Sequence, residues 1–313
     1  MGHLIINLNK FLIMKNRKNK MEKWLKYLLI VTFISITSSL MAQEIAAKEK
    51  KVSKPVKNTF ESIWLFDNQS VMVPIKKTFE LDIMHRFGTV NKGYEDFIGL
   101  FAPSNIRIGA SYVPIKNLNI GLGFTKFNNT WDASAKYAIL HQTKDDKMPM
   151  SVTYYGNVTV DTRPIDNFNY SSERYSFFNQ IIIARKINDK LSAQIAPSVS
   201  HQNSVQGYYS APGKISKIME NDHIAIAFGA RYKLKESMCL IVNYDQPITK
   251  HASNNPNPNL SLGIEMNTSA HAFQFFLGNY FYLSPQYNNI SNHNNWEDRK
   301  FLIGFNITRL WNY

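Results

Sequence analysis

The chain has 313 residues, of which 44% are apolar, 13% aromatic and 19% charged, and its formal net charge is +13. Seven basic residues lie within residues 1–42 and several more within Lys48–Lys57, so the remainder is nearly balanced and a folded nucleic-acid-binding surface is excluded. The single cysteine, Cys239, excludes an internal disulfide framework and a multi-cysteine metal site.

The N-terminal segment predicts export. Two lysines follow Met21, then comes the apolar run Leu28–Ile36, and then small and polar residues as far as Ala42. This order is typical of a cleaved secretory signal peptide, so residues 1–42 are interpreted as a signal peptide whose true start is Met21. No later run reaches the about 18 apolar residues of a membrane helix, so the exported protein is either soluble or crosses a membrane as strands.

Residues 43–77 are expected to form a Lys-rich segment in the periplasm. The lysines concentrate in Lys48–Lys57, and the segment lacks the alternation that begins at Thr78. Three roles remain open for it: a plug inside a barrel, an extra strand, or a site for a periplasmic protein partner.

From Thr78 onward the apolar residues recur with a period of two. In the stretch TFELDIMHRF, for example, Phe79 and Leu81 fall on one face while Glu80 and Asp82 fall on the other. The polar faces carry Gly, Ser, Asn and Thr with few charges, which suits a confined wet lumen better than an open surface. The apolar faces then point toward lipid, as in outer-membrane barrels.

About twelve such segments are expected, each near the about ten residues of a tilted spanning strand. They are residues 78–87, 104–114, 118–127, 130–142, 150–161, 173–187, 190–201, 223–234, 237–248, 258–267, 270–283 and 300–313. Long and short connections alternate between them, apart from the short third connection at Phe127–Asn129. The prediction is an all-β fold: a transmembrane antiparallel up-and-down β-barrel of about twelve strands over residues 78–313.

The last stretch, FLIGFNITRLWNY, ends inside a strand. A closed barrel pairs its last strand with its first, so such an ending leaves no exposed edge. Its alternating residues Phe305, Ile307, Trp311 and Tyr313 resemble the C-terminal signal that outer-membrane barrels present to their assembly machinery, although Arg309 interrupts the apolar face. The expected partners are therefore outer-membrane lipid and the barrel-assembly machinery.

Four stretches resemble a known family. They are FELDIMHRFGTV (Phe79–Val90), PSNIRIGASY (Pro103–Tyr112), NLSLGIEMNTSAHAFQFFLGN (Asn259–Asn279) and the terminal FLIGFNITRLWNY. The chain is similar to exported outer-membrane β-barrels of Gram-negative bacteria, of the Bacteroidetes type, that carry only a domain-of-unknown-function label. The resemblance implies a barrel in the cell outer membrane and supplies no substrate or chemistry.

Eight charged residues fall on the presumed inner face of the barrel. They are Asp82, Arg86, Arg107, Asp132, Lys136, Arg231, Asp245 and Glu265. Because buried charges are usually compensated, we expect them to pair across the lumen. Such pairing favours a narrow or occluded channel over a wide porin, which takes about sixteen strands.

One motif carries a candidate for catalysis. His251 and Ser253 in HASNN are similar to the His-x-Ser-Asn motif of the outer-membrane phospholipase, in which His is the base for the Ser nucleophile. The match ends there, because Asn255 and Pro256 replace the Gly-Arg of that enzyme and the tract has the composition of a loop. The other histidines are scattered singly without metal-ligand spacing, so neither a metal nor a cofactor is expected.

The sequence therefore predicts a non-enzymatic outer-membrane barrel, either a narrow passive channel for small solutes or a structural barrel that serves a periplasmic partner. Two alternatives stay open. One is an outer-membrane lipid hydrolase that uses His251 and Ser253. The other is an exported soluble β-barrel that binds an apolar ligand inside.

Overall fold

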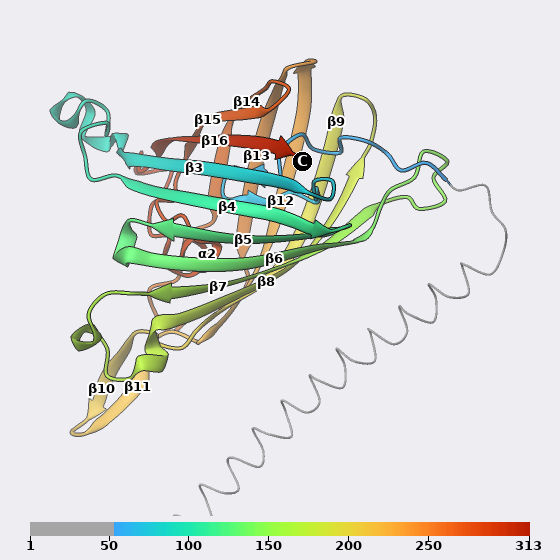
Figure 1. The fold of residues 1–313 in the computed structure, drawn as a ribbon. Coiled ribbons are helices and arrows are strands. Elements are labelled where there is room, and N and C mark those ends of the chain that lie inside the picture. Colours follow the sequence, from blue (N-terminus) through green and yellow to red (C-terminus); the bar gives the residue numbers. More distant parts are fainter. Residues whose placement is uncertain (1–52) are drawn as a thin grey trace, which may run out of the picture. The chain divides into compact units, whose positions relative to one another are not determined.

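The barrel predicted from the alternation is present. The computed structural model describes residues 53–313, and the signal peptide expected at residues 1–42 lies outside them. Residues 54–313 form one compact unit, built around a closed antiparallel barrel of twelve strands (Figure 1). Within the described residues, no helix combines the length and the apolar character that a membrane crossing requires.

The barrel strands follow the predicted segments closely. They are β3 (Thr78–Thr89), β4 (Asn105–Ile115), β5 (Leu118–Thr125), β6 (Thr130–Leu140), β7 (Ser151–Asp161), β8 (Tyr175–Lys186), β9 (Leu191–Gln202), β12 (Asp222–Lys235), β13 (Met238–Pro247), β14 (Asn259–Asn267), β15 (His271–Gly278) and β16 (Leu302–Asn312). The largest difference is in β15, where the chain leaves the barrel wall at Gly278 instead of continuing to residue 283.

The closure of the barrel explains why the chain ends in a strand. β16 pairs antiparallel with β3, with Ile307 opposite Ile83 and Trp311 opposite Phe79. The rings of Phe79 and Trp311 lie 5.6 Å apart between centroids. Arg309, which interrupts the apolar face, lies with its guanidinium 4.7 Å from the centre of the Trp311 ring. The last strand therefore has a partner on both sides and leaves no edge open.

Side chains alternate between the outer surface and the lumen. In β3 the apolar Leu81 and Ile83 are partly exposed outside, whereas Glu80 and Asp82 are buried inside. The inner face is not polar everywhere, because Phe178 of β8 also points inward and is buried. The lumen thus has a charged side, formed by β3–β6, and a mixed side from β8 to β13 on which apolar, amide and hydroxyl groups lie beside the charges of Arg231 and Asp245.

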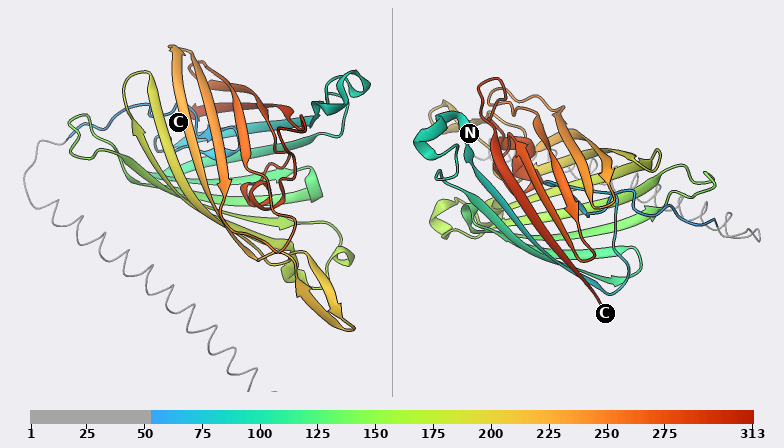
Figure 2. Two further views of the ribbon diagram at one scale, coloured as in Figure 1. Left: turned by 180° about the vertical axis from the view of Figure 1, so that it is seen from behind. Right: turned by 90° about the horizontal axis from the view of Figure 1, so that it is seen from above.

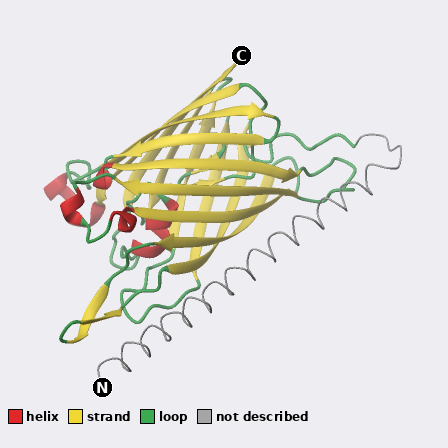
Figure 3. Cartoon of the chain, turned by 60° about the horizontal axis from the view of Figure 1, so that its bottom comes forward, coloured by secondary structure: helices red, strands yellow, loops and turns green. Residues whose placement is uncertain are grey.

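The two ends of the barrel differ. The long connections gather at one end, on the left in Figure 1, which we call the loop end; the opposite, turn end carries short turns (Figures 1 and 2). The loop end holds η1 (Val90–Asp96), η2 (Phe127–Asn129), η3 (Ile165–Asn167), η4 (Ser171–Arg174), the hairpin β10 (Gly207–Ala211) with β11 (Lys214–Lys217), and the helix α2 (Pro285–Ser291) (Figure 3). The sequence predicted loops at the positions of β10, β11 and α2.

Candidate functional site in the barrel lumen

Residues 59–71 lie inside the lumen, and we call them the N-terminal plug. The plug contains a short hairpin, β1 (Trp64–Leu65) paired with β2 (Asn68–Gln69), and its side chains are buried apart from partly exposed Glu61. The turn of the hairpin bends at Phe66, which has a left-handed φ of 61°. Of the three roles left open for residues 43–77, the structure therefore assigns that of a plug to these thirteen positions, whereas Lys54 and Lys57 before it are exposed.

Side chains of the barrel wall bind the backbone of the plug. A hairpin with two-residue strands leaves most of its carbonyl groups without a ladder partner, and buried carbonyls need donors. Four wall side chains supply them: Thr153 donates to the carbonyl of Val71 (2.7 Å), Gln194 to Gln69 (2.9 Å), Gln274 to Trp64 (2.8 Å) and Asn306 to Phe66 (2.6 Å). The donors come from β7, β9, β15 and β16, so the plug is held around most of the barrel.

Apolar packing holds the plug on the mixed side of the lumen. Four plug side chains, Phe60, Leu65, Phe66 and Val71, form one buried cluster with the inward-facing residues Tyr155, Phe178, Ile182, Ala184, Ala196, Ala227, Ile241 and Phe276, together with Tyr280. The rings of Phe66 and Phe276 are 4.2 Å apart. Each buried apolar side chain of this size contributes about 1.5–3 kcal/mol. The inward Phe and Ile residues, which did not fit a wet lumen, are thus explained by the plug.

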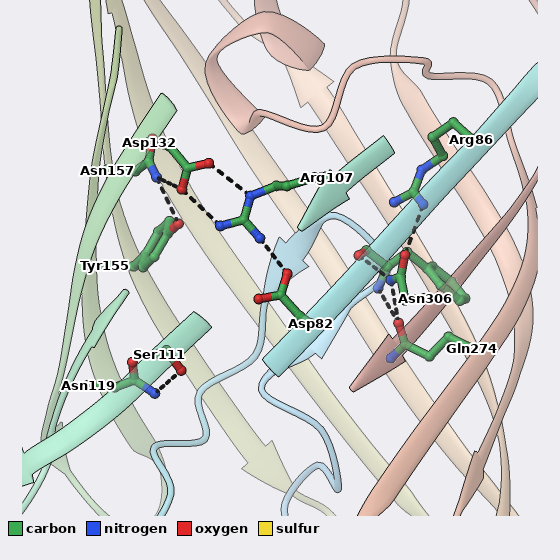
Figure 4. Close-up of polar contacts among 11 residues, drawn as sticks. Asp82, Arg86, Arg107, Ser111, Asn119, Asp132, Tyr155, Asn157, Gln274 and Asn306 are labelled. Atoms are coloured by element: carbon green, nitrogen blue, oxygen red, sulfur yellow. Dashed lines mark hydrogen bonds and ion pairs between the residues drawn. The ribbon is translucent and has the colours of Figure 1, made fainter. Parts of the chain in front are cut away.

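The charged side of the lumen is organised around Arg107. Its guanidinium donates to Asp132, with Nε 2.9 Å from Oδ1, and forms a second ion pair with Asp82 (Figure 4). A side chain at Gly123 would clash with this guanidinium, so the close approach of Arg107 to β5 requires glycine there. The same guanidinium lies 5.5 Å from the ring of Trp64 in the plug. Ion pairing of inner charges occurs here, but between strands β3, β4 and β6 on one side of the barrel and not across the lumen as expected.

The other charges bind the plug or neutral groups instead of each other. Arg231 donates to Glu61 of the plug (2.6 Å), and Lys136 donates to Gln69 of the plug (3.0 Å). Arg86 donates to Asn306 (2.9 Å), Glu265 accepts from Gln274 and Asn267, and Asp245 accepts from three asparagines. All eight side chains named from the sequence are buried in the barrel. Their pairing differs from expectation because the plug takes up the centre of the lumen.

A second plug closes the loop end, and we call residues 279–300 the loop plug. Its helix α2 packs against β8, β9 and β12. Asn288 donates to Asp67 at the turn of the N-terminal plug (2.8 Å), and Gln286 donates to Asn157 of the wall (2.7 Å). The two plugs therefore touch in the middle of the barrel. The loop plug is hard to recognise in the sequence, because its many asparagines are typical of exposed loops. The usable signal is the large number of asparagines in a segment that has no charged residue before Glu297.

Little space remains between the plugs. A cavity of about 10 Å³ lies among Trp64, Asp67 and Asp132, and one of about 20 Å³ lies beside Lys136; a single water needs roughly 10–15 Å³. Two larger cavities lie toward the ends of the lumen: about 230 Å³ between the N-terminal plug and the turn at residues 267–272, and about 380 Å³ between η1 and the loop plug. Among the described residues, the lumen is therefore closed in its central part.

The candidate hydrolytic pair is not assembled. His251 is buried; its Nδ1 accepts from the backbone N–H of Glu220 (3.0 Å), and its Nε2 lies 3.1 Å from Nδ1 of His223. Ser253 is exposed in the loop after β13. Both ring nitrogens of His251 are occupied, so the ring is not positioned as a base for Ser253. Residues 53–313 contain no group of three or more His, Cys, Asp or Glu side chains that could hold a metal.

The barrel is similar to several solved structures. It matches the NanC porin with a TM-score of 0.45 and 9% identity, covering 75% of this chain and 99% of that one. The KdgM porin gives 0.44 and 9%, covering 74% and 98%. The COG4313 outer membrane channel from Pseudomonas putida F1 gives 0.47 and 11%, covering 77% and 97%. None of the curated proteins matches the chain. Residues 60–311 match the family described as Membrane bound beta barrel domain (DUF5777), so the chain belongs to this family of membrane-bound β-barrels, as the resemblance implied.

Proposed function

We propose that the protein resides in the outer membrane and forms a narrow channel for small polar solutes, which the N-terminal plug keeps closed. The observation that carries this proposal is the position of residues 59–71 across the lumen. Both ends of the plug lead to the turn end: Val56 pairs there with Gln142, and residues 72–77 run into the start of β3. The plug can therefore withdraw toward that end without unthreading the chain.

The chemistry of the wall supports a lumen that is hydrated in one of its states. Glu80, Asp82, Arg86, Arg107 and Asp132 all face inward on the charged side. Burying an ion costs several kcal/mol even when it is paired, so a wall that only ever faced a plug would be more stable with apolar side chains. Water in an open lumen removes that cost, so the charged wall supports a lumen that is hydrated when it is open.

The proposal is tested by conductance in planar lipid bilayers. We expect the wild-type protein to be closed with rare openings. Replacing Gln274 and Asn306 by Ala leaves two buried plug carbonyls without donors, at about 1–3 kcal/mol each, so the open fraction should rise at least about tenfold. Phe275→Ala with Leu277→Ala changes outward side chains close to Gln274 on β15 and is the control. Equal conductance in both double variants would refute gating by the plug.

A structural barrel is the second candidate, and the apolar cluster of Phe60, Leu65, Phe66 and Val71 favours it. Such packing resembles the core of a permanently closed protein. In this case every plug variant that still folds would remain silent in the bilayer. The same experiment therefore distinguishes the two functions.

We also propose the cellular setting expected from the sequence. The turn end faces the periplasm, where exposed Lys54 and Lys57 offer a contact for a periplasmic partner, and the outward Phe305 and Ile307 with Trp311 and Tyr313 form the assembly signal. Fractionation with a gel comparison of boiled and unboiled protein tests the location. Purification without an attached periplasmic protein would count against the partner, and normal assembly of Trp311→Ala with Tyr313→Ala would count against the signal.

We propose, finally, that the barrel is not an enzyme, because the His251 ring is committed to Glu220 and His223. Purified protein should release no fatty acid from phospholipid vesicles. Release that disappears in Ser253→Ala would overturn this part of the proposal.

A further inference from the structure

The cavity of about 230 Å³ at the turn end lies between the N-terminal plug and the barrel wall. Its wall side contains Glu80 of β3, Leu310 of β16, which lies opposite Glu80 in the strand pairing, and Ala272 near the start of β15. Its other side is formed by residues 61–63 of the plug and by residues 72–74, which lead from the plug toward β3. Since a single water needs roughly 10–15 Å³, this space accepts a small organic molecule.

Glu80 is a buried carboxylate with a free oxygen atom. Its side chain faces the lumen, the residue is 2% exposed, and within residues 53–313 its Oε1 accepts no hydrogen bond. Lys136 acts on Glu80 through its charge, but the Lys136 ammonium donates to Gln69 (3.0 Å) and to the carbonyl of Ile63 (3.4 Å). The indole of Trp64 also lies near Glu80, although its Nε1 makes no hydrogen bond to any described residue. A buried charged acceptor without a donor is unfavourable, so Oε1 indicates a missing donor.

The lining of the cavity selects the charge and the shape of a ligand. Its titratable side chains are Glu61, Glu80 and His271, and the described residues that line it include no lysine or arginine. The carboxylate of Glu61 is already bound by Arg231, so Glu80 is the acid that remains available. The apolar part of the lining is formed mainly by Ile63, Met72, Val73 and Leu310. A ligand that fits therefore needs a positive end that donates hydrogen bonds, and an apolar body.

We propose that this cavity binds a small primary amine, whose ammonium group donates to Glu80 and whose alkyl chain packs against the apolar lining. An alkylammonium group carries three donors and a full positive charge, so it supplies the donor that Oε1 of Glu80 lacks. Calcium fits poorly, because it takes six to eight oxygen ligands and one available carboxylate beside apolar side chains supplies too few. An anion would face two carboxylates in the lining.

Water and a proton are the competing occupants. Water would hydrate Oε1 of Glu80, but it would also remain in contact with the apolar part of the lining, which an alkyl chain removes from water. A proton would neutralise Glu80, and a neutral carboxyl group would bind an alcohol about as well as an amine. An alkylammonium matches both parts of the lining, whereas water and a proton each match one. Comparing an amine with the alcohol of the same length therefore distinguishes the three occupants.

A bound amine would contact the wall and the N-terminal plug at the same time. Residues 61–63 and 72–74 lie close to the points where the chain enters and leaves the plug. A ligand that needs both surfaces in place stabilises the docked plug by mass action. This inference concerns a binding site and does not depend on whether the barrel conducts, because binding is measured independently of conductance.

The test titrates the full chain, folded in detergent, with n-butylamine and in parallel with 1-butanol by isothermal titration calorimetry at neutral pH, where the amine is protonated. We expect saturable binding of one butylamine per chain, at least about tenfold tighter than that of butanol, as for one hydrogen bond to a charged group. Butylamine should also raise the temperature of barrel unfolding. Absence of butylamine binding would indicate a cavity filled by water only, and equal binding of the amine and the alcohol would indicate a neutral Glu80. Either result would overturn the proposal.

Two variants assign the site. Glu80→Gln keeps the shape of the side chain and should weaken butylamine binding at least about tenfold, while butanol binding stays unchanged. Asp161→Asn is the matched control, since Asp161 is a buried carboxylate that pairs with Arg163 at the loop end; it should bind butylamine as the wild type does. If Glu80→Gln does not fold, Ala272→Leu serves, because it fills the cavity while Glu80 stays in place, and it should lose the binding of both ligands. Butylamine bound with wild-type affinity by Glu80→Gln or by Ala272→Leu would overturn the assignment.

Discussion

Phe66→Ala tests whether the N-terminal plug can leave while the barrel stays folded. Phe66 is fully buried, its ring lies 4.2 Å from that of Phe276, and it belongs to the apolar cluster inside the lumen. Truncating a buried Phe to Ala costs about 3–5 kcal/mol. If this cost falls on plug docking alone, the undocked fraction rises between about 140-fold and about 3,700-fold, at tenfold for each 1.4 kcal/mol.

The native Cys239 reports on the docked plug. It is the single cysteine of the chain, it is buried at 0% exposure, and its sulfur accepts from Arg231, which also binds Glu61 of the plug. Withdrawal of the plug should expose the thiol to the lumen. We therefore expect a bulky, membrane-impermeant maleimide to label Cys239 slowly in the wild type and much faster in Phe66→Ala.

The control is Phe275→Ala, which removes a neighbouring aromatic ring from the outer surface, where Phe275 is 45% exposed. Its labelling rate should match that of the wild type. Both variants should still migrate as compact barrels on unboiled gels. Labelling of Phe66→Ala at the wild-type rate, or equally fast labelling of both variants, would refute the reasoning, because the plug would then not move independently of the barrel.

Two further predictions concern charge and pH. Arg107→Met leaves Asp82 and Asp132 buried without their partner. The free energy of unfolding should therefore fall by about 3–5 kcal/mol, and the unfolding temperature should fall with it. Replacing both aspartates by Asn in the same variant should recover most of this stability. Burial lowers the pKa of His251, so the folded protein favours the neutral ring. The contribution of the neutral ring to folding stability is fully present above about pH 6.5 and is lost as the pH falls below that value. Cleavage by trypsin at neighbouring Lys250 should therefore accelerate on acidification, relative to His251→Gln, whereas equal pH profiles would contradict the prediction.

The strands were predictable because each outward face must be apolar regardless of what fills the lumen. β4 and β7 lie within one residue of the predicted segments at each end. β8 held a further signal, since the run Ile181–Ile183 is apolar on both faces of the strand. Such a run indicates burial on the inner side as well, and Ile182 is indeed buried against the plug cluster.

The plug could not be placed from the sequence because its partners are distant along the chain. Phe66 is bound by Gln274 and Asn306, which lie 208 and 240 residues away. The hairpin strands are two residues long, so they show no detectable alternation. The eight inward charges could be named from the period of two, but their partners depended on what occupies the lumen.

The barrel and the plug are stabilised by different sets of hydrogen bonds, so we expect the plug to undock without unfolding of the barrel. The strand ladder is complete without the plug, since β16 closes on β3. The plug is held by side chains instead, and ordering each of its residues costs about 1–2 kcal/mol. Against this, each hydrogen bond contributes about 0.5–1.5 kcal/mol and each large buried apolar side chain about 1.5–3 kcal/mol. These opposing contributions are similar in size, so we expect the net free energy of plug docking to be small. The barrel is stabilised separately by the hydrogen bonds between its strands. A modest change at the plug, such as the loss of the Phe66 ring, should therefore undock it while the barrel remains intact.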